Sequence, residues 1–336
     1  MLAQPEDVRV AAFGEYAVRR IRDDQERVLR QYGVEFDRWV SESNEIRKPQ
    51  FPEKMIDLFK ARDLAYESEG AVWFRASRFG DDQDRVLVKS DGELTYFASD
   101  IAYHLFKFEG VDRLIDFLGP DHHGYIPRMR AAMLALGKPA EAFQALIVQL
   151  VTLLRSGEPV RMSKRRGEFV LMDELIEEVG RDAARFTFLA RRHDSPLDFD
   201  LDVVTQQKPD NPVYYVQYCH ARVCSIFHHL ARKKLVVPDW NGVDLTPLEV
   251  PEELGLIKRL LQLPALTEGA ARALEPHRVA YYLQELAAAC HPYYKRYRVV
   301  GDNLALTHAR LALVAAVGQV VRNGLELLGV SAPEKM

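Results

Sequence analysis

Cysteine is scarce in this chain of 336 residues, which contains only Cys219, Cys224 and Cys290. Three scattered thiols cannot build a disulfide framework, so the sequence excludes the small disulfide-stabilised secreted domains and indicates a reducing compartment. Residues 1–20 also lack the apolar segment of a secretory signal. We therefore expect a cytoplasmic protein.

A long apolar run and an excess of positive charge are also absent. No apolar stretch of the sequence approaches the roughly 20 residues that a membrane span requires, so we expect no membrane partner. The formal net charge is −4, and an acidic balance gives no general attraction to nucleic acid. An RNA partner would therefore have to be bound by a local basic surface.

Two widespread nucleotide-binding motifs are missing as well. The sequence contains neither a G-x-G-x-x-G fingerprint nor a P-loop, which argues against a dinucleotide-dependent dehydrogenase and a P-loop NTPase. His122 and His123 are adjacent, so they would point in opposite directions on an extended segment, and no third ligand follows at zinc spacing. Cys219, His220 and Cys224 fall within a helical pattern and suit buried packing better. We expect no metal site.

Length and pattern predict two domains. A chain of 336 residues exceeds the size at which one core usually stops growing. From about residue 60 to 200, short apolar runs alternate with helical patterns, which is typical of an α/β domain with a parallel sheet. Beyond about residue 210 helical periodicity dominates, and two prolines interrupt both patterns at 206–213. The predicted fold is an α/β domain at 1–205 followed by an all-α domain at 206–336.

The segment 114–137 is the clearest α/β unit. Residues 114–118 suit a buried strand that a Gly-Pro pair ends, and apolar residues then recur at helical spacing from Ile126 to Gly137. Residues 121–124 would thus form a loop at the carboxyl end of a strand, where ligands bind in open α/β sheets. We therefore expect polar contacts from this loop to a bound substrate.

The segment 93–108 has a similar pattern. Residues 94–97 suit a strand, and the apolar residues that follow at helical spacing mark a helix that Ser99 or Asp100 could cap. On local sequence alone, an N-cap is the favoured interpretation of Asp100. Tyr96 is compatible with a place in the core.

A cluster of cations lies between Gly157 and Gly167, in the stretch GEPVRMSKRRGEFV at 157–170. A bare run of basic residues is usually a solvated surface. Here Pro159 stiffens the entry and the apolar Met162 interrupts the charges, so the pattern indicates a loop with one packing anchor rather than a charged face.

This loop carries a resemblance to a known family. Residues 162–165, Met-Ser-Lys-Arg, resemble the KMSKS signature of class I aminoacyl-tRNA synthetases, with arginine in place of the first lysine and the final serine. Four stretches, the first of which begins with these residues, resemble arginyl-tRNA synthetase in the order found in that family: MSKRRGEFVLMDELIEEVGRDAARFTFL, SPLDFDLD, NPVYYVQYCHARVCSI and NGLELLGVSAPEKM. The resemblance extends from about Phe36 to Met336.

The resemblance implies how ATP and arginine are bound. Lys164, Ser163 and Arg161 would be the catalytic residues, placing positive charge and a hydroxyl on the phosphates as the adenylate forms. The ATP-binding residues would be Met162, Ser163, Lys164 and Arg165, with Met162 beside the adenine. Mg²⁺ would be held by ATP oxygens and water, and no permanently bound cofactor is expected.

The same resemblance assigns arginine binding to Tyr96, Asp100 and His122. A guanidinium is a planar fork of donors that a carboxylate meets with two hydrogen bonds. The match of Asp100 to the acidic contact of the family therefore overrides its interpretation as an N-cap.

In the helical region, Tyr215, Tyr218, Tyr294 and Met336 match positions that bind the anticodon in the family. Aromatic faces stack on the bases of single-stranded loops. An equally good interpretation of Tyr215 and Tyr218 alone is a core stripe at spacing i, i+3. Arg222, one turn further on, could pair with a phosphate or form a surface ion pair.

The family also has a His-Ile-Gly-His signature, and no such tetrapeptide occurs in these 336 residues. We therefore expect the carboxyl-terminal portion of an arginine–tRNA ligase: a partial class I nucleotide-binding domain of the Rossmann-like type, followed by a helical-bundle anticodon-binding domain. The expected reaction joins L-arginine to tRNA(Arg) through arginyl-adenylate, by a monomer, with tRNA(Arg), L-arginine and ATP as partners. The alternative is a catalytically inactive fragment or paralogue that binds tRNA or a protein partner.

Overall fold

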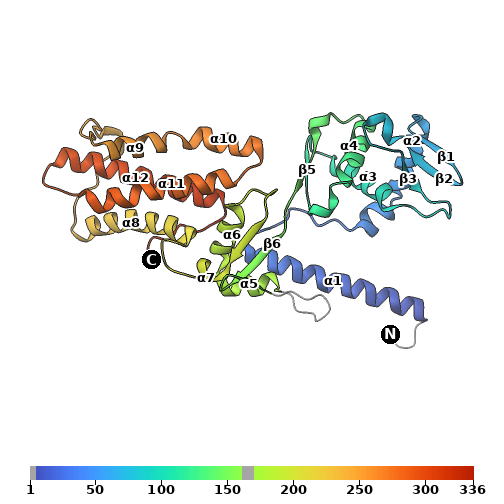
Figure 1. Ribbon diagram of the computed structural model, residues 1–336, viewed down its shortest axis with the longest axis horizontal. Helices are drawn as coiled ribbons and strands as arrows, with labels where there is room; N and C mark the ends of the chain where they lie inside the picture. Colours follow the sequence, from blue (N-terminus) through green and yellow to red (C-terminus); the bar gives the residue numbers. More distant parts are fainter. Residues whose placement is uncertain (1–4, 161–169) are drawn as a thin grey trace. The chain divides into compact units, whose positions relative to one another are not determined.

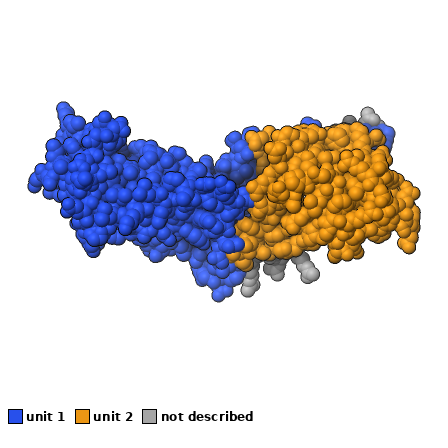
Figure 2. Space-filling model, turned by 90° about the horizontal axis from the view of Figure 1, so that it is seen from above, with its two compact units in different colours: residues 1–35, 151–192, 197–336 blue, residues 36–150, 193–196 orange. Residues whose placement is uncertain are grey.

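The computed structural model describes residues 5–160 and 170–336, which form two compact units (Figures 1 and 2). Unit 2 comprises residues 36–150 and 193–196, and unit 1 comprises 1–35, 151–192 and 197–336. Each unit has its own cluster of buried apolar side chains. The division of labour between them can therefore be followed unit by unit.

Unit 2 contains five strands and three α-helices in its described part. In chain order its elements are the π-helix η1 Glu42–Arg47, α2 Phe51–Ala61, β1 Ala65–Ser68, β2 Ala71–Phe74, the 3₁₀ turn η2 Ala76–Phe79, β3 Arg85–Val88, α3 Tyr96–Lys107, β4 Leu114–Leu118, the 3₁₀ turn η3 Pro120–His122, α4 Tyr125–Ala135, the 3₁₀ turn η4 Ala140–Ala142 and β5 Phe143–Ile147.

Unit 2 contains two separate sheets, and only one of them is parallel. Strands β4 and β5 pair in parallel, with α4 in the crossover between them, as the sequence predicts. Strands β1, β2 and β3 instead form an antiparallel meander, which the expectation of a parallel α/β sheet did not include. Their connections are short, and short connections can join only antiparallel neighbours.

The predicted strand at 94–97 is wrong. Thr95 is the N-cap of α3, and its Oγ1 accepts a hydrogen bond from Ala98 N at 3.3 Å, so helix α3 begins at Tyr96. Leu94 makes one isolated antiparallel bridge to Val88 and no strand. Asp100 therefore lies inside the helix and does not cap it.

Unit 1 combines a small sheet with a helical bundle. In chain order its elements are α1 Glu6–Tyr32, β6 Val151–Arg155, β7 Glu158–Pro159, α5 Met172–Val179, α6 Arg181–Leu189, β8 Leu197–Asp200, α7 Leu201–Val204, α8 Pro212–Arg232, the 3₁₀ turn η5 Trp240–Gly242, α9 Pro251–Leu260, α10 Leu263–Ala273, α11 His277–Arg296 and α12 Leu304–Leu327. Strand β6 pairs in parallel with β8 and antiparallel with β7.

The bundle begins where the sequence predicts a junction. Asn211 caps α8, its side chain accepting from Tyr214 N and donating to Val204 O, and Pro212 occupies the first turn of the helix. From this point to residue 336 the chain contains helices and no strand. The change from a strand-and-helix pattern to a helical one is therefore confirmed.

Helix α12 packs against α8, α9 and α11 in this bundle. Its length and mean hydropathy of 1.6 match those of a membrane span, which the sequence analysis did not anticipate. Ten of its residues are buried by the bundle, as is common for a core helix. A Cβ added at Gly324 would lie 2.6 Å from Leu283 Cδ2, so this glycine permits the close approach of α11 and α12.

Candidate functional site

The residues of the predicted signature loop, Arg161, Met162, Ser163, Lys164 and Arg165, lie outside the described residues. The described chain reaches this segment through β6 and β7 and resumes at Val170, shortly before α5. The site can therefore be built from the predicted arginine-binding residues of unit 2 and the predicted anticodon-binding residues of unit 1.

Tyr96 and Asp100 lie one turn apart on α3, and this spacing places both side chains on one face of the helix. Tyr96 is 84% exposed, so it does not belong to the core. Asp100 is half-buried and accepts a hydrogen bond from the Tyr125 hydroxyl at 3.0 Å. An exposed ring beside a partly buried carboxylate is a suitable arrangement for a cation with a flat face.

Burial raises the pKa of the Asp100 carboxyl above its ordinary value, although the hydrogen bond from Tyr125 and the charge of His104 act in the opposite direction. A bound cation would favour the ionised carboxylate and reverse this effect of burial. The cost of burying the Asp100 carboxylate is thus only partly offset by its neighbours.

His122 lies in the turn η3 that follows β4, at the carboxyl end of that strand, as the sequence predicts. Its side chain is exposed, and its ring meets the Tyr125 ring edge-on with centroids 6.3 Å apart. Tyr125 therefore contacts both Asp100 and His122. It is the first residue of α4 and was not singled out by the sequence analysis.

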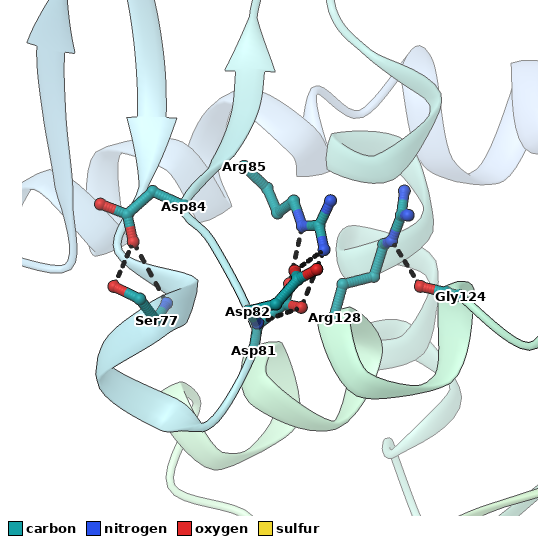
Figure 3. Close-up of polar contacts among 7 residues, drawn as sticks. All are labelled: Ser77, Asp81, Asp82, Asp84, Arg85, Gly124 and Arg128. Carbon is teal, nitrogen blue, oxygen red and sulfur yellow. Dashed lines mark hydrogen bonds and ion pairs between the residues drawn. The ribbon is translucent and has the colours of Figure 1, made fainter.

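The turn before α4 and the connection between β2 and β3 are held by polar contacts (Figure 3). Arg128 Nε donates to Gly124 O at 3.0 Å, which closes the first turn of α4. Nearby, Arg85 makes two hydrogen bonds to Asp81, at 2.7 and 2.8 Å, and the side chain of Asp81 is almost fully buried. The hydrogen bonds from Arg85 lower the pKa of Asp81, so this pair stays charged and acts as a structural clamp.

Unit 1 contains a hollow of about 810 Å³ between α8, α11 and the end of the chain. It is lined by Tyr218, Ala221, Arg222, Ser225, His228, Ala231, Arg232, Tyr294, Glu334, Lys335 and Met336. Three of the four predicted anticodon-binding residues are thus brought together, although Tyr218 and Met336 are more than a hundred residues apart in sequence.

Arg222 is held between two rings of this hollow. Its Cζ lies 4.4 Å from the centroid of Tyr218 and 5.2 Å from that of Tyr294, which are cation–π distances. Tyr215, the fourth predicted residue, does not line the hollow; its ring packs against His291 at 4.4 Å. Arg222 donates to His291 Nδ1, and His291 Nε2 lies 3.0 Å from Tyr215 O. Tyr215 therefore contacts His291, which in turn contacts Arg222 of the hollow.

Three cationic side chains line the hollow, those of Arg222, Arg232 and Lys335, against one anionic side chain, Glu334. His228 Nε2 lies 3.4 Å from Glu334 Oε2. The hollow is thus a local basic surface with half-buried aromatic rings, on a chain whose net charge is negative. This is the combination that single-stranded RNA requires.

The last residues of the chain are fastened to α8 and α6. Gln217 Nε2 donates to Ser331 O at 2.9 Å, and His220 Nδ1 lies 2.9 Å from Pro333 O. Asp182 accepts from Ser331 N at 3.2 Å. These contacts fix the direction in which the three terminal residues reach the hollow.

A metal site was not expected. In the ranges 5–160 and 170–336, no group of three or more His, Cys, Asp and Glu side chains is placed to hold a metal ion. Cys224 Sγ lies 3.7 Å from His220 Nε2 within α8, as a helical neighbour one turn away.

Comparison with known proteins decides the family. Residues 4–196 match the family model described as tRNA synthetases class I (R), catalytic domain, and residues 216–336 match the DALR anticodon binding domain. A solved structure from Campylobacter jejuni, assigned as an arginyl-tRNA synthetase, is 32% identical with a TM-score of 0.89, covering 99% of this chain and 71% of that one. The chain belongs to the class I arginyl-tRNA synthetase family.

The curated relatives agree. An arginine–tRNA ligase of Syntrophotalea carbinolica is 51% identical over 333 residues, and one of Symbiobacterium thermophilum is 48% identical over 336 residues. These alignments cover 99% and 100% of this chain but only 60% of each relative. A structure of the Thermus thermophilus arginyl-tRNA synthetase, 24% identical with a TM-score of 0.79, shares the fold. The chain spans about three-fifths of the length of the curated relatives it matches.

Membership of the arginyl-tRNA synthetase family confirms the predicted fold, a class I catalytic domain followed by a helical anticodon-binding domain. Catalysis in this family depends on ATP. The matched ranges leave residues 197–215 between the two domains, and a boundary at 205/206 stays a prediction.

Several residues of the hollow in unit 1 were missed by sequence reasoning, namely Ser225, His228, Arg232 and Lys335. A signal for the first three exists, because with Tyr218 and Arg222 they recur at spacings of three and four on one face of α8. Lys335 has no such signal, since its place depends on the anchored end of the chain.

Proposed function

We propose that this chain is the carboxyl-terminal portion of an arginine–tRNA ligase, which in the complete enzyme attaches L-arginine to tRNA(Arg) with consumption of ATP. One observation carries the proposal: 51% identity over 99% of the chain to a relative named arginine–tRNA ligase. The reaction activates the arginine carboxylate as arginyl-adenylate and then transfers the arginyl group to tRNA. The substrate carboxylate is already a nucleophile, so positioning and charge stabilisation dominate the catalysis.

Arginine is selected through its guanidinium group. Asp100 accepts two hydrogen bonds from it, and Tyr96 covers its flat face. The shared face of the two side chains on α3, the exposure of Tyr96 and the incomplete charge compensation of Asp100 support this assignment. His122, in the turn beside Tyr125, contacts another part of the amino acid.

ATP is bound by the loop that contains Met162, Ser163, Lys164 and Arg165. Lys164, together with Arg161 and Ser163, stabilises the negative charge that develops on the phosphates. Mg²⁺ arrives with ATP and is held by phosphate oxygens and water. No resident cofactor is needed for this chemistry. The density of positive charge in a short segment supports the assignment.

The anticodon loop of tRNA(Arg) binds in the hollow of unit 1. Tyr218, Tyr294 and Met336 contact its bases, Tyr215 supports them through His291, and Arg222 pairs with a phosphate or stacks on a base. The volume of the hollow, its aromatic lining and its excess of positive charge support this proposal. Residues 1–205 would then serve catalysis and residues 206–336 anticodon recognition, in a monomeric cytoplasmic enzyme.

The test is aminoacylation by the 336 residues alone and by a complete ligase, made by joining them to the amino-terminal portion of the Syntrophotalea carbinolica relative. With ATP, Mg²⁺, arginine and tRNA(Arg), the complete ligase should turn over at about 1–10 per second, an ordinary enzymatic rate. The 336 residues alone should bind tRNA weakly without charging it. When catalytic groups act together, the loss of some of them removes nearly all of the rate enhancement. An inactive complete ligase would contradict the proposal. Charging by the 336 residues alone would show that catalysis does not need the His-Ile-Gly-His signature, which these residues lack.

A further inference from the structure

Tyr125 links the two places on unit 2 where arginine is proposed to bind. Its hydroxyl donates to Asp100 Oδ2 at 3.0 Å, and its ring contacts the ring of His122 edge-on. Burial raises the pKa of Tyr125, so the phenol keeps its proton and remains a donor at physiological pH. One lone pair of the Asp100 carboxylate is therefore permanently occupied.

The backbone at Asp100 is fixed by a second residue of α3, His104. His104 lies one turn further on and is 4% exposed; its Nδ1 donates to Asp100 O at 2.7 Å, since a carbonyl can only accept. Its Nε2 lies 2.6 Å from Oδ2 of Asp116, a residue of β4. The helix that carries Asp100 is thus tied to the strand whose end leads into the His122 turn.

Asp116 is a permanent anion at this point. Burial would raise its pKa, but hydrogen bonds and charge from His104 and from Lys107, whose Nζ lies 2.7 Å from Asp116 Oδ1, outweigh that effect and lower it to about 2. The carboxylate therefore stays ionised throughout the physiological pH range and keeps hold of both partners.

We infer that Tyr125 is a positioning residue for guanidinium recognition, which fixes the plane of the Asp100 carboxylate, with the His104–Asp116 pair holding the backbone beneath it. This inference rests on the proposed role of Asp100 in arginine binding. A bidentate pair requires the carboxylate and the guanidinium to be coplanar. Asp100 has one χ1 and one broad χ2 torsion, and the Tyr125 hydrogen bond restrains both. It occupies one lone pair of Oδ2 and leaves Oδ1 and the second lone pair of Oδ2 free for the guanidinium.

A purely structural role for Tyr125 predicts something different. Its ring packs against the core of unit 2 together with α4 residues. If the hydroxyl merely held α3 to α4, its removal would lower the stability of unit 2 and leave the affinity for arginine unchanged. Measurement of the arginine KM therefore distinguishes the positioning role from the structural role, whereas measurement of stability does not.

The experiment uses the complete ligase described above and the substitution Tyr125→Phe, which keeps the packed ring and removes only the hydroxyl. Arginine KM should rise about tenfold, the scale of a lost hydrogen bond to a charged group, while kcat and the KM for ATP change less than twofold. Agmatine, which keeps the guanidinium and lacks the carboxylate, should lose inhibitory potency by a similar factor. Asp116→Asn should move arginine KM in the same direction.

Tyr66→Phe is the matched control, because it also removes a tyrosine hydroxyl that acts on a carboxylate of unit 2, that of Asp84, and neither residue is part of α3. It should leave every kinetic constant unchanged. An unchanged arginine KM in Tyr125→Phe, in a ligase where Asp100→Ala raises it, would overturn this inference and leave the proposed function standing. A normal arginine KM in Asp100→Ala would overturn the arginine site itself.

Discussion

Tyr294 offers the sharpest test of the hollow in unit 1. It is half-buried on α11, it lines the hollow, and its ring is one of the two that flank Arg222. The substitution Tyr294→Ala removes an aromatic face without touching the core, since its neighbour Tyr293 carries the buried contacts of this turn. The expected result is weaker binding of tRNA(Arg) to these 336 residues.

The size of the effect follows from what the ring does. Loss of one base-stacking contact costs about 1–3 kcal/mol, which corresponds to roughly a 5- to 150-fold rise in Kd. Tyr294→Phe keeps the stacking face and the cation–π contact with Arg222, so its Kd should stay within about twofold of the wild type. Removal of Met336, which is 51% exposed at the rim of the hollow, should fall in the same range as Tyr294→Ala.

Binding has to be measured directly, because charging could depend on tRNA for other reasons. Fluorescence anisotropy with labelled tRNA(Arg), at one fixed salt concentration, gives the Kd. Tyr281→Ala is the matched control: this tyrosine is 46% exposed on the same helix α11 and does not line the hollow. Equal Kd values for the wild type, Tyr294→Ala and the chain ending at Lys335 would refute the anticodon assignment.

Three further predictions concern arginine binding and stability. In the complete ligase, Asp100→Ala should raise the arginine KM sharply and leave the KM for ATP nearly unchanged; a normal arginine KM would be the contrary result. Glu253→Gln should lower the free energy of urea unfolding by about 3–5 kcal/mol. The fully buried Glu253 accepts from Arg310 Nε at 2.7 Å, and the substitution leaves the mostly buried Arg310 without its charged partner. Glu268→Gln, in an exposed pair, should change it by less than about 1 kcal/mol. Burial lowers the pKa of His291 below its ordinary 6.5, so the unfolded chain takes up this proton first and stability should fall as the pH drops below about 6.5. Urea unfolding at several pH values should show a smaller fall in His291→Gln, and an equal fall would disprove this cause.

Local patterns in the sequence were sufficient to predict much of this fold. The strand Leu114–Leu118, the following turn and helix α4 all occur where apolar spacing predicts them. Helix α8 begins at the predicted junction because Asn211 and Pro212 are start signals that act within a few residues. Signals of this kind need no information from distant parts of the chain.

The prediction of a strand at 94–97 is wrong because a contact with another strand decides the conformation of these residues. The residue types at 94–97 suit a strand, but Thr95 Oγ1 accepts from Ala98 N and donates to Val86 O. The second contact comes from strand β3, and it fixes Thr95 as a cap before the helix. Tertiary contacts thus overrode a short local pattern, as they often do for β-propensity.

In the candidate site, too, some residues could be predicted from local sequence and others could not. Tyr96 and Asp100 share a helix face, so their spacing was visible in the sequence once the family resemblance had marked them. Tyr125 was overlooked, because its contact with Asp100 joins residues 25 positions apart on two helices. No periodicity within either helix predicts a hydrogen bond between them.

The hollow in unit 1 shows why the end of the chain matters to a site on helices α8 and α11. Residues 334–336 can line it only if the segment after α12 turns back along α8, and no local pattern in that segment requires this. The direction is imposed by Gln217 and His220, which bond Ser331 O and Pro333 O. Both are buried polar side chains, so each needs a partner, and the returning chain supplies it. The requirement to satisfy two polar groups of α8 therefore positions the terminal residues beside Arg222.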